Sequence, residues 1–579
     1  MRLDPHSYTD DAQPATRSFA WRARVDFAAQ VLDAEVTLAF AAPGGGPLDL
    51  DTRDLAIAAV TDARGAALPF EVAAPEPHLG ARLRIELPAE SASVTIRYRT
   101  APGASALQWL APAQTAGGVH PYLFSQCQAI HARSIVPLQD TPRLRVTYTA
   151  ELTFPRELVA VMAAADRGRT EGAEAVHRWE MPQPIPPYLL ALAVGDLASR
   201  DISPRSRVWA EPSVVDAAAW EFGDVEAMIG AAESLFGPYD WERFDILLMP
   251  PSFPYGGMEN PRLTFITPTV VAGDRSLVSV IAHELAHSWT GNLVTNANAE
   301  HFWLNEGFTM YAERRITEAL DGAEMASLSA ALGRRELDES LRRFAATPAM
   351  TKLRTHLEGI DPDEGYSLIP YEKGYFFLTA LEAHVGRPRF EAWLRTYLRA
   401  FRFGAITTEQ FLAHFEAALP GALAAVDAPA WLDGEGIPAS AAAPASARLS
   451  AIEALGASAP SDALAQSWNA TEWALYLESL PRPVPRALVE ALDARFALTA
   501  SKNYDVLIPW LTIAIQAGYA PATPRVERLL GEVGRMKYLR PMYTELAARD
   551  HDRAAALFAA NRASYHPVAQ QMVEGVLRR

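Results

Sequence analysis

The five residues His283-Glu284-Leu285-Ala286-His287 decide how this sequence is interpreted. In a helix, residues four positions apart share a face, so both imidazoles can reach one metal ion. The glutamate between them lies beside the open coordination position, where it can take a proton from a water molecule. The segment 277–293 contains no proline and one late glycine, so we expect a helix there.

A third ligand is expected on the next helical run, 303–315. Eighteen residues separate His287 from Glu306, and a returning helix can present this carboxylate to the same ion. Two histidines, one carboxylate and a free position form the ligand set of a catalytic zinc. The same ligands could hold iron, but the helical histidine pair with its internal glutamate favours zinc. Chance copies of the five-residue motif occur on surface helices, and Glu306 argues against one here.

Glu313 has two possible roles, and the sequence leaves both open. It lies seven residues after Glu306 on the same helix face. It could hydrogen-bond a ligand histidine from behind. It could equally form a surface ion pair with Arg314 or Arg315.

The composition is that of a globular protein. The 579 residues are 49% hydrophobic and 21% charged, which excludes a disordered chain and allows about four structural units. The net charge of −17 argues against nucleic acid or an anionic membrane as main partner. Cys127 is the single cysteine, which excludes a disulfide scaffold. No secretory h-region is visible, and the longest apolar run, 158–165, is too short to span a membrane, so we expect a cytoplasmic protein.

The hydrophobic pattern divides the chain into a multidomain α+β protein. Residues 1–200 show the period-two alternation of an antiparallel β-domain. The alternating runs are 31–40, 82–87, 94–98 and 143–152. The glycine-rich segment 42–47 is interpreted as a hairpin turn. Residues 201–435 are mixed and then helical, with helices expected at 277–293 and 309–320, and form the predicted catalytic domain.

The sequence pattern of the last part of the chain predicts helices only. Residues 436–448 are small, uncharged and interrupted by proline, as in linkers. Residues 449–579 form the predicted C-terminal all-α domain, a stack of short amphipathic helices. Its clearest helices are 472–480, 486–496 and 509–517, and we expect Pro481, Pro485, Pro521 and Pro541 at helix ends.

Three groups of motifs resemble those of the gluzincin aminopeptidases of metallopeptidase family M1. They are Pro254-Tyr-Gly-Gly-Met-Glu-Asn260, the segment 283–294 with Phe302-Trp-Leu-Asn-Glu-Gly307, and Pro370-Tyr-Glu-Lys-Gly374. The segments 123–131, 361–363 and 534–538 are similar to the leukotriene A(4) hydrolase/aminopeptidase branch of that family. The resemblance covers nearly the whole chain. It implies a β-domain, a thermolysin-like zinc domain and a solenoid-like helical domain.

The resemblance also implies roles around one zinc ion held by His283, His287 and Glu306. Glu259 would anchor the substrate's α-ammonium group, and Tyr371 would donate to the oxyanion. Glu284 would move the proton of the attacking water to the leaving amine. The implied substrate-binding residues are Gln126, Gln128, Gly256, Gly257, Met258, Glu259, Asp363, Tyr366, Arg535 and Lys537.

Two parts of this set bear on specificity. Asp363 and Tyr366 match positions near the first substrate side chain, where Asp363 could favour a basic residue or direct water in epoxide opening. Arg535 and Lys537 match residues that bind the substrate's carboxylate, although a solvated basic pair is the commoner fate of such residues. With the amine at Glu259, a second anchor would favour short peptides, tripeptides above all.

The expected function is therefore that of a monomeric zinc aminopeptidase acting on peptides with a free N-terminus. One alternative is hydrolysis of a fatty-acid epoxide of the leukotriene A(4) type. A non-catalytic scaffold would have lost Glu284 or the ligands, and none is lost. An endopeptidase is disfavoured because an occupied amine anchor at Glu259 requires a chain end.

Overall fold

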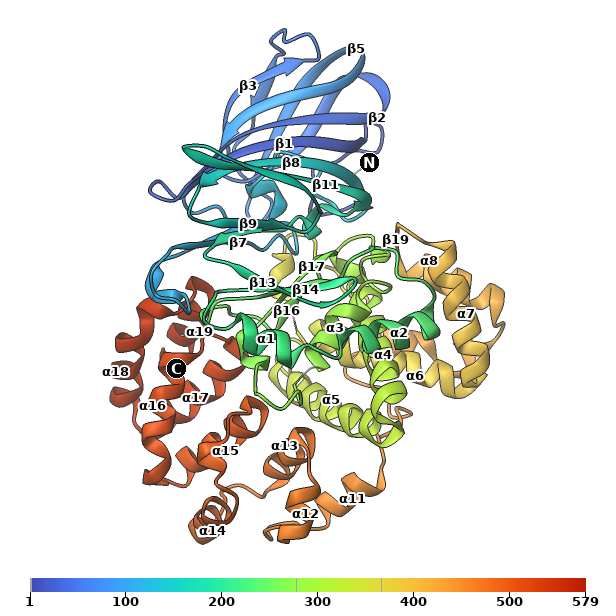
Figure 1. Ribbon diagram of the computed structural model, residues 1–579. Helices are drawn as coiled ribbons and strands as arrows, with labels where there is room; N and C mark the ends of the chain where they lie inside the picture. Colours follow the sequence, from blue (N-terminus) through green and yellow to red (C-terminus); the bar gives the residue numbers. More distant parts are fainter. Residues whose placement is uncertain (1–2, 278, 366, 579) are drawn as a thin grey trace.

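The chain forms a β-rich N-terminal part that packs on a mixed central part, with a helical C-terminal part beside the latter (Figure 1). The computed structural model describes residues 3–277, 279–365 and 367–578. The predicted succession of strands, mixed structure and helices is confirmed. The residue numbers of the domain boundaries stay a prediction, and Tyr366 lies outside the described residues. Among the described helices, none is both long and apolar enough to cross a membrane.

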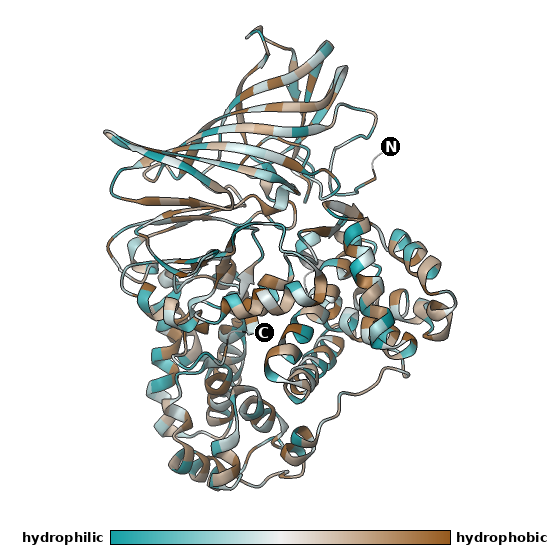
Figure 2. Ribbon diagram, turned by 45° about the vertical axis from the view of Figure 1, so that its right-hand side comes forward, coloured by the Kyte–Doolittle hydropathy of each residue, from teal (hydrophilic) through white to brown (hydrophobic). Residues whose placement is uncertain are grey.

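The N-terminal part is built on one long twisted sheet. Its strands run in the order β10 (Ala165–Glu171), β11 (Glu174–Ile185), β8 (Val146–Pro155), β1 (Thr16–Asp26), β2 (Val31–Thr52), β5 (Ala81–Arg99) and β3 (Ala56–Asp62), and β4 (Phe70–Val72) also pairs with β5. Pairing is antiparallel except between β1 and β8, which run parallel. Hydrophilic and hydrophobic residues alternate along these strands (Figure 2), so one face is left for the core.

The glycine-rich segment in β2 is not a hairpin turn, so that prediction is wrong. β2 continues through it and pairs with β5 on both sides, with register shifts around Gly44. A Cβ atom on Gly45 would lie 2.8 Å from the Cα atom of Ala89, and Gly46 has a φ of +88°. The glycines therefore make an irregularity at which two long paired strands bend. For the same reason the predicted strands 82–87 and 94–98 belong to one strand, β5.

Two smaller sheets connect this N-terminal part to the central part of the chain. The first has the order β6 (Leu107–Leu110), β7 (Tyr122–Ser125), β12 (Leu192–Gly195) and β9 (Val159–Met162). The second has the order β13 (Ala198–Ser203), β14 (Ser206–Ala210), β15 (Asp245–Leu248), β17 (Leu263–Ile266) and β16 (Gly257–Met258). The edge strand β16 leads directly into Glu259.

The helices of the central part include α3 (Ser279–Ala286), which carries the histidine motif up to Ala286, and α4 (Trp303–Asp321), which carries Glu306. The predicted helix 277–293 is too long, because the helix ends at Ala286. Gly291 has a φ of +112°, and a Cβ atom there would lie 2.3 Å from Asn305 Oδ1, so the chain turns against α4. The predicted helix 309–320 is confirmed within α4.

This part contains further helices, several of which contact α4 (Figure 1). They are α1 (Val215–Glu221), α2 (Val225–Phe236), α5 (Ala323–Arg343), the π-helical turn η8 (Ile369–Lys373), α6 (Gly374–Val385), α7 (Arg387–Ala400), α8 (Thr408–Ala418), α9 (Ala422–Ala425) and α10 (Ala428–Leu432). The short strands β18 (Val294–Asn296) and β19 (Gly404–Ile406) pair in parallel beside them.

The C-terminal part is all helical, as predicted. Its helices are α11 (Ala447–Glu453), α12 (Asp462–Ser467), α13 (Ala470–Ser479), α14 (Arg486–Phe496), α15 (Tyr504–Gln516), α16 (Thr523–Glu532), α17 (Met536–Arg549), α18 (His551–Asn561) and α19 (Pro567–Leu577). The expected end position of Pro541 is wrong, because it lies inside α17, as Pro509 lies inside α15. Buried apolar side chains on both helices outweigh the missing backbone hydrogen bond.

Candidate metal centre and active site

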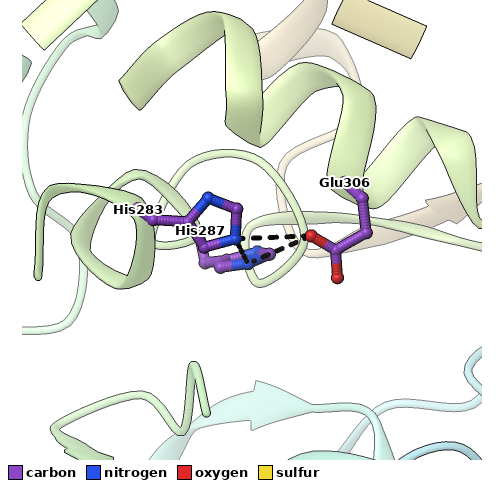
Figure 3. A group of neighbouring side chains, drawn as sticks. All are labelled: His283, His287 and Glu306. Atoms are coloured by element: carbon purple, nitrogen blue, oxygen red, sulfur yellow. Dashed lines mark hydrogen bonds and ion pairs between the residues drawn. The ribbon is translucent and has the colours of Figure 1, made fainter. Parts of the chain in front are cut away.

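Three side chains converge on one position, which we call the metal point (Figure 3). They are His283 from α3, His287 from the turn after α3, and Glu306 from α4. The Nε2 atoms of His283 and His287 lie 3.2 Å apart. The Oε2 atom of Glu306 lies 3.5 Å from each of them. This oxygen is buried, and none of the described residues forms a hydrogen bond with it. An orphaned buried carboxylate oxygen beside two imidazole nitrogens fits a metal ion.

The opposite ring nitrogens fix the tautomers that a metal requires. His283 Nδ1 lies 3.0 Å from Glu313 Oε2, and His287 Nδ1 lies 3.1 Å from the carbonyl oxygen of Thr290. Both oxygens can only accept, so each Nδ1 carries the proton and each Nε2 offers a lone pair. Thr309 adds a hydroxyl 3.1 Å from His287 Nδ1. No sequence signal marked Thr309.

Glu313 thus takes the first of its two possible roles, behind a ligand histidine. The neighbouring arginines pair with other acids. Arg314 binds Glu372, and Arg315 binds Glu318 and Glu391. The zinc chemistry expected from the sequence agrees with these donors, two imidazoles and one carboxylate.

Glu284 lies between the two histidines in sequence. It faces the loop 254–260, which includes β16. A Cβ atom on Gly257 would lie 2.2 Å from Glu284 Oε1, so a larger residue there would displace this carboxylate. Burial raises the pKa of Glu284 well above its usual value. The charge of His283 opposes this effect and the carboxylate of Glu259 adds to it. A carboxylate in these surroundings holds a proton more readily than a solvated one, as a general base must.

Glu259 provides a second buried carboxylate next to the metal point. Its side chain accepts a hydrogen bond of 3.2 Å from Gln128 Nε2, and burial raises its pKa to about 7. The Asn292 side chain donates to the backbone carbonyl of Glu259 over 2.7 Å and fixes the loop. Gln126 instead donates to the sulfur of Met258 over 3.1 Å. Of the two predicted glutamines, only Gln128 touches Glu259 directly.

Tyr371 lies on η8 beside the metal point. Its ring stacks on that of His283 with a centroid distance of 6.0 Å and an interplanar angle of 17°, and Phe302 packs edge-on at 6.2 Å. Burial, with the carboxylates of Glu306 and Glu259, raises the pKa of the Tyr371 phenol well above its usual value. The hydroxyl therefore stays protonated and can donate a hydrogen bond.

Asp363 lies farther out and is partly exposed. Its Oδ2 atom lies 2.7 Å from the Nε2 atom of His131, and His131 belongs to the N-terminal part. A pocket whose lining includes Gln128 and Pro370 lies between the N-terminal part and the central part of the chain. Apolar side chains predominate in its lining: Ile130, Pro142, Phe302, Met350, Leu353, Leu357 and Pro362.

Arg535 reaches the site from the helical part. A Cβ atom on Gly256 would lie 2.9 Å from its Nη2 atom, so the guanidinium lies directly on the loop that leads to Glu259. Its Nη1 atom donates to the hydroxyls of Thr269 (3.2 Å) and Tyr538 (2.9 Å), and its Nε atom is buried with no partner in the part of the chain that the structure describes.

Lys537 lies in the same segment but behaves differently. Its side chain is 53% exposed, and Nζ lies 3.3 Å from Glu336 Oε1 on α5. Hydrogen bonds from Gly534 to Pro251 (2.8 Å) and from Met536 to Pro254 (3.0 Å) join this segment to the loop. The two basic residues are thus near one another, but only Arg535 packs on the loop.

Comparison with known proteins agrees with this geometry along the whole chain. Residues 5–189 match the peptidase M1 N-terminal domain, 220–430 the peptidase family M1 domain and 468–577 the leukotriene A4 hydrolase C-terminal domain. Leukotriene A-4 hydrolase of Xenopus laevis is 38% identical over 98% of both chains. Leucine aminopeptidase 2 of Yarrowia lipolytica is 40% identical over 85% of this chain and 81% of its own.

Solved structures give the same result. Yeast LTA4 hydrolase in complex with bestatin superposes with a TM-score of 0.93 at 33% identity, over 100% of this chain and 98% of the other. An M1 zinc metallopeptidase of Deinococcus radiodurans, at 21% identity and a TM-score of 0.61, shares the fold over 76% of this chain and 100% of its own. The chain therefore belongs to peptidase family M1, in its leukotriene A4 hydrolase branch, and is a peptide-bond hydrolase with one catalytic zinc ion.

Proposed function

We propose that this enzyme is an aminopeptidase that removes the first residue of short peptides, above all tripeptides. The observation that carries the proposal is the buried carboxylate of Glu259 next to the metal point. Ligand atoms of Glu259, Glu284 and His287 all lie within 4.8 Å of one another. Relatives named leucine aminopeptidase 2 support the same activity.

The amine end of the site determines which bond is cleaved. An ammonium group next to Glu259 stabilises the charged form of this buried carboxylate, because an opposite charge outweighs the cost of burial. Gln128 supplies its amide to the same place. With the ammonium group held there, only the first carbonyl of a peptide reaches the metal point. The enzyme would thus release one amino acid per turnover.

The chain's own residues then move one proton and stabilise one charge. His283, His287 and Glu306 would hold the zinc ion. When bound, zinc polarises the carbonyl and lowers the pKa of water at the open position. Glu284 takes the proton of the attacking water and passes it to the leaving nitrogen. The hydroxyl of Tyr371 donates to the oxygen that becomes negatively charged.

Arg535 would set the length preference. Its guanidinium lies on the loop that leads to Glu259, and its Nε atom finds no partner among the described residues. A fork of N–H donors suits a carboxylate. A carboxylate a few residues beyond the amine therefore finds a partner here, which favours tripeptides over longer chains.

Three substrates test the proposal: a free tripeptide, its N-acetylated form and an aminoacyl-anilide. We expect cleavage of both free-amine substrates and none of the acetylated peptide. A chelator should abolish activity and added zinc should restore it, because three side-chain ligands leave an exchangeable position. Rapid cleavage of the acetylated peptide, or full activity of a verified metal-free sample, would overturn the proposal.

We also propose a second, lesser activity, hydrolysis of a fatty-acid epoxide of the leukotriene A(4) type. The supporting observation is the pocket at Gln128 and Pro370, in whose lining apolar side chains predominate. Relatives named leukotriene A-4 hydrolase agree with it. Asp363 would direct the water. Incubation with a lipid epoxide should give a dihydroxy acid, and its absence at high enzyme concentration would exclude this activity.

We further propose that the enzyme works in the cytoplasm as a monomer, without nucleic acid or membrane partners. Its one cysteine, Cys127, is buried and unpaired, as suits a reducing compartment. The net charge of −17 repels polyanions. Light scattering of the purified enzyme should give the mass of one chain, 63.1 kDa, and a multiple of it would contradict the monomer.

A further inference from the structure

Tyr371 lies next to two buried charged side chains. Glu372 and Lys373 follow it directly and are 2% and 0% exposed. An isolated buried charge is costly, so each needs partners. Lys373 donates from Nζ to the carbonyl oxygens of Thr351 (2.9 Å) and Gly434 (2.8 Å). This lysine holds one side of the turn that presents Tyr371.

Glu372 is held by Arg314 in a two-pronged ion pair. Arg314 Nη1 lies 2.9 Å from Glu372 Oε2, and Nη2 lies 2.8 Å from Oε1. The guanidinium also covers the ring of Tyr375 at 4.1 Å. A Cβ atom on Gly333 would lie 2.3 Å from both Arg314 Nη2 and Glu372 Oε2. Gly333 on α5 thus leaves the space that the Arg314–Glu372 ion pair occupies.

The ion pair connects the two elements on which the site depends. Arg314 belongs to α4, which also carries Glu306, whereas Glu372 belongs to η8 with Tyr371. A second contact joins the same elements, because a Cβ atom on Gly307 would lie 3.1 Å from the backbone carbonyl oxygen of Pro370 on η8. A backbone contact at one place and an ion pair at another fix how η8 lies on α4.

We propose that the Arg314–Glu372 ion pair positions Tyr371 against the metal site, and that Glu372 is a positioning residue of the reaction. This inference rests on the proposed role of Tyr371. A buried ion pair adds little stability compared with apolar packing, so its value here is the geometry that it specifies. π-Helical turns often occur at functional sites, and an oxyanion donor must lie within about 2.7–3.1 Å of its target.

The test is a double-mutant cycle with Glu372→Gln and Tyr371→Phe. Glu372→Gln keeps the size of the side chain but removes the charge. We expect kcat on an aminoacyl-anilide to fall about 10- to 100-fold, the scale for a misplaced catalytic group, with KM within about threefold and one zinc per chain. On the Tyr371→Phe background the same change should cost less than about twofold, because Glu372 acts through Tyr371.

A matched control breaks an equally buried pair elsewhere. Arg133 and Asp140 are 0% and 2% exposed and lie in the N-terminal part, 3.0 Å apart. Asp140→Asn should lower Tm without changing kcat. If Glu372→Gln fails to fold, Arg314→Lys replaces it in the cycle, since lysine keeps the charge but loses the fork.

The outcomes separate the two proposals. If the Tyr371→Phe enzyme keeps near wild-type activity, Tyr371 has no catalytic role. The positioning role of Glu372 is then overturned as well. If Tyr371→Phe is crippled but the loss from Glu372→Gln adds to it in full, only the positioning role is overturned. An unchanged kcat in Glu372→Gln overturns it as well.

Discussion

The two ends of the proposed peptide site are built differently. At the amine end, Glu259 is 4% exposed, and Glu306 beside the two histidines is 2% exposed. At the carboxylate end, Arg535 and Lys537 come from the helical part, and the Lys537 side chain is 53% exposed. The buried end would perform the chemistry that every substrate needs. The more open end can add affinity for some substrates and can change without loss of the reaction.

The comparison predicts that the largest loss comes from Glu284→Gln. The amide cannot accept the proton of the attacking water, so kcat should fall about 10²- to 10⁴-fold on every substrate. Zinc content should stay at one ion per chain, because Glu284 is not among the three converging ligands. Steady-state kinetics and metal analysis measure both.

The exposed Glu324 on α5 provides a control of the same chemistry. Glu324→Gln should leave kcat unchanged. If Glu284→Gln stays within about tenfold of the wild type, the general base is another group.

Glu259→Ala should cause the next largest loss. The substrate's ammonium group would lose its buried ionic partner, which costs about 2–5 kcal/mol in kcat/KM. The loss should be similar for a tripeptide and an anilide, because both carry the free amine. Kinetics on this substrate pair measure it, and a loss confined to one of the two would contradict the amine anchor.

The buried end was also the more predictable from sequence. His283, His287 and Glu306 have fixed chemistry and spacing, and the structure brings their ligand atoms together. The supporting contacts carry no such signal. Thr309 and Arg314 look like ordinary helix residues, and only the three-dimensional packing reveals their partners.

The predicted ends of strands and helices show the same limit of sequence-based prediction. Gly44–Gly46 and Pro541 were expected to end elements, but pairing with β5 and buried apolar side chains on α17 continue them. Local residue preferences are weaker than tertiary packing in both places. The alternating and helical patterns gave the architecture because they depend on which face is buried.

At the open end, Arg535→Ala should distinguish substrates. For a free tripeptide it should cost about 2–4 kcal/mol in kcat/KM, the scale for unpairing a desolvated charge. For the amidated tripeptide and the anilide the loss should be much smaller, because neither carries a carboxylate. Kinetics on the three substrates check this. Equal losses on all three would mean that Arg535 only holds the helical part in place.

Lys537→Ala should have the smallest effect. The exposed ammonium of Lys537 is already paired with Glu336 over 3.3 Å, and exposed ion pairs are worth about 0–1 kcal/mol. We therefore expect less than about a fivefold loss in kcat/KM for the free tripeptide, shrinking further as salt screens the charge. Glu336→Gln is the matched control, because it frees Lys537 and should raise kcat/KM for the same substrate. A loss as large as that of Arg535→Ala, unchanged at high salt, would mean that Lys537 leaves Glu336 to bind the carboxylate, and the two ends would then be equally enclosed with substrate bound.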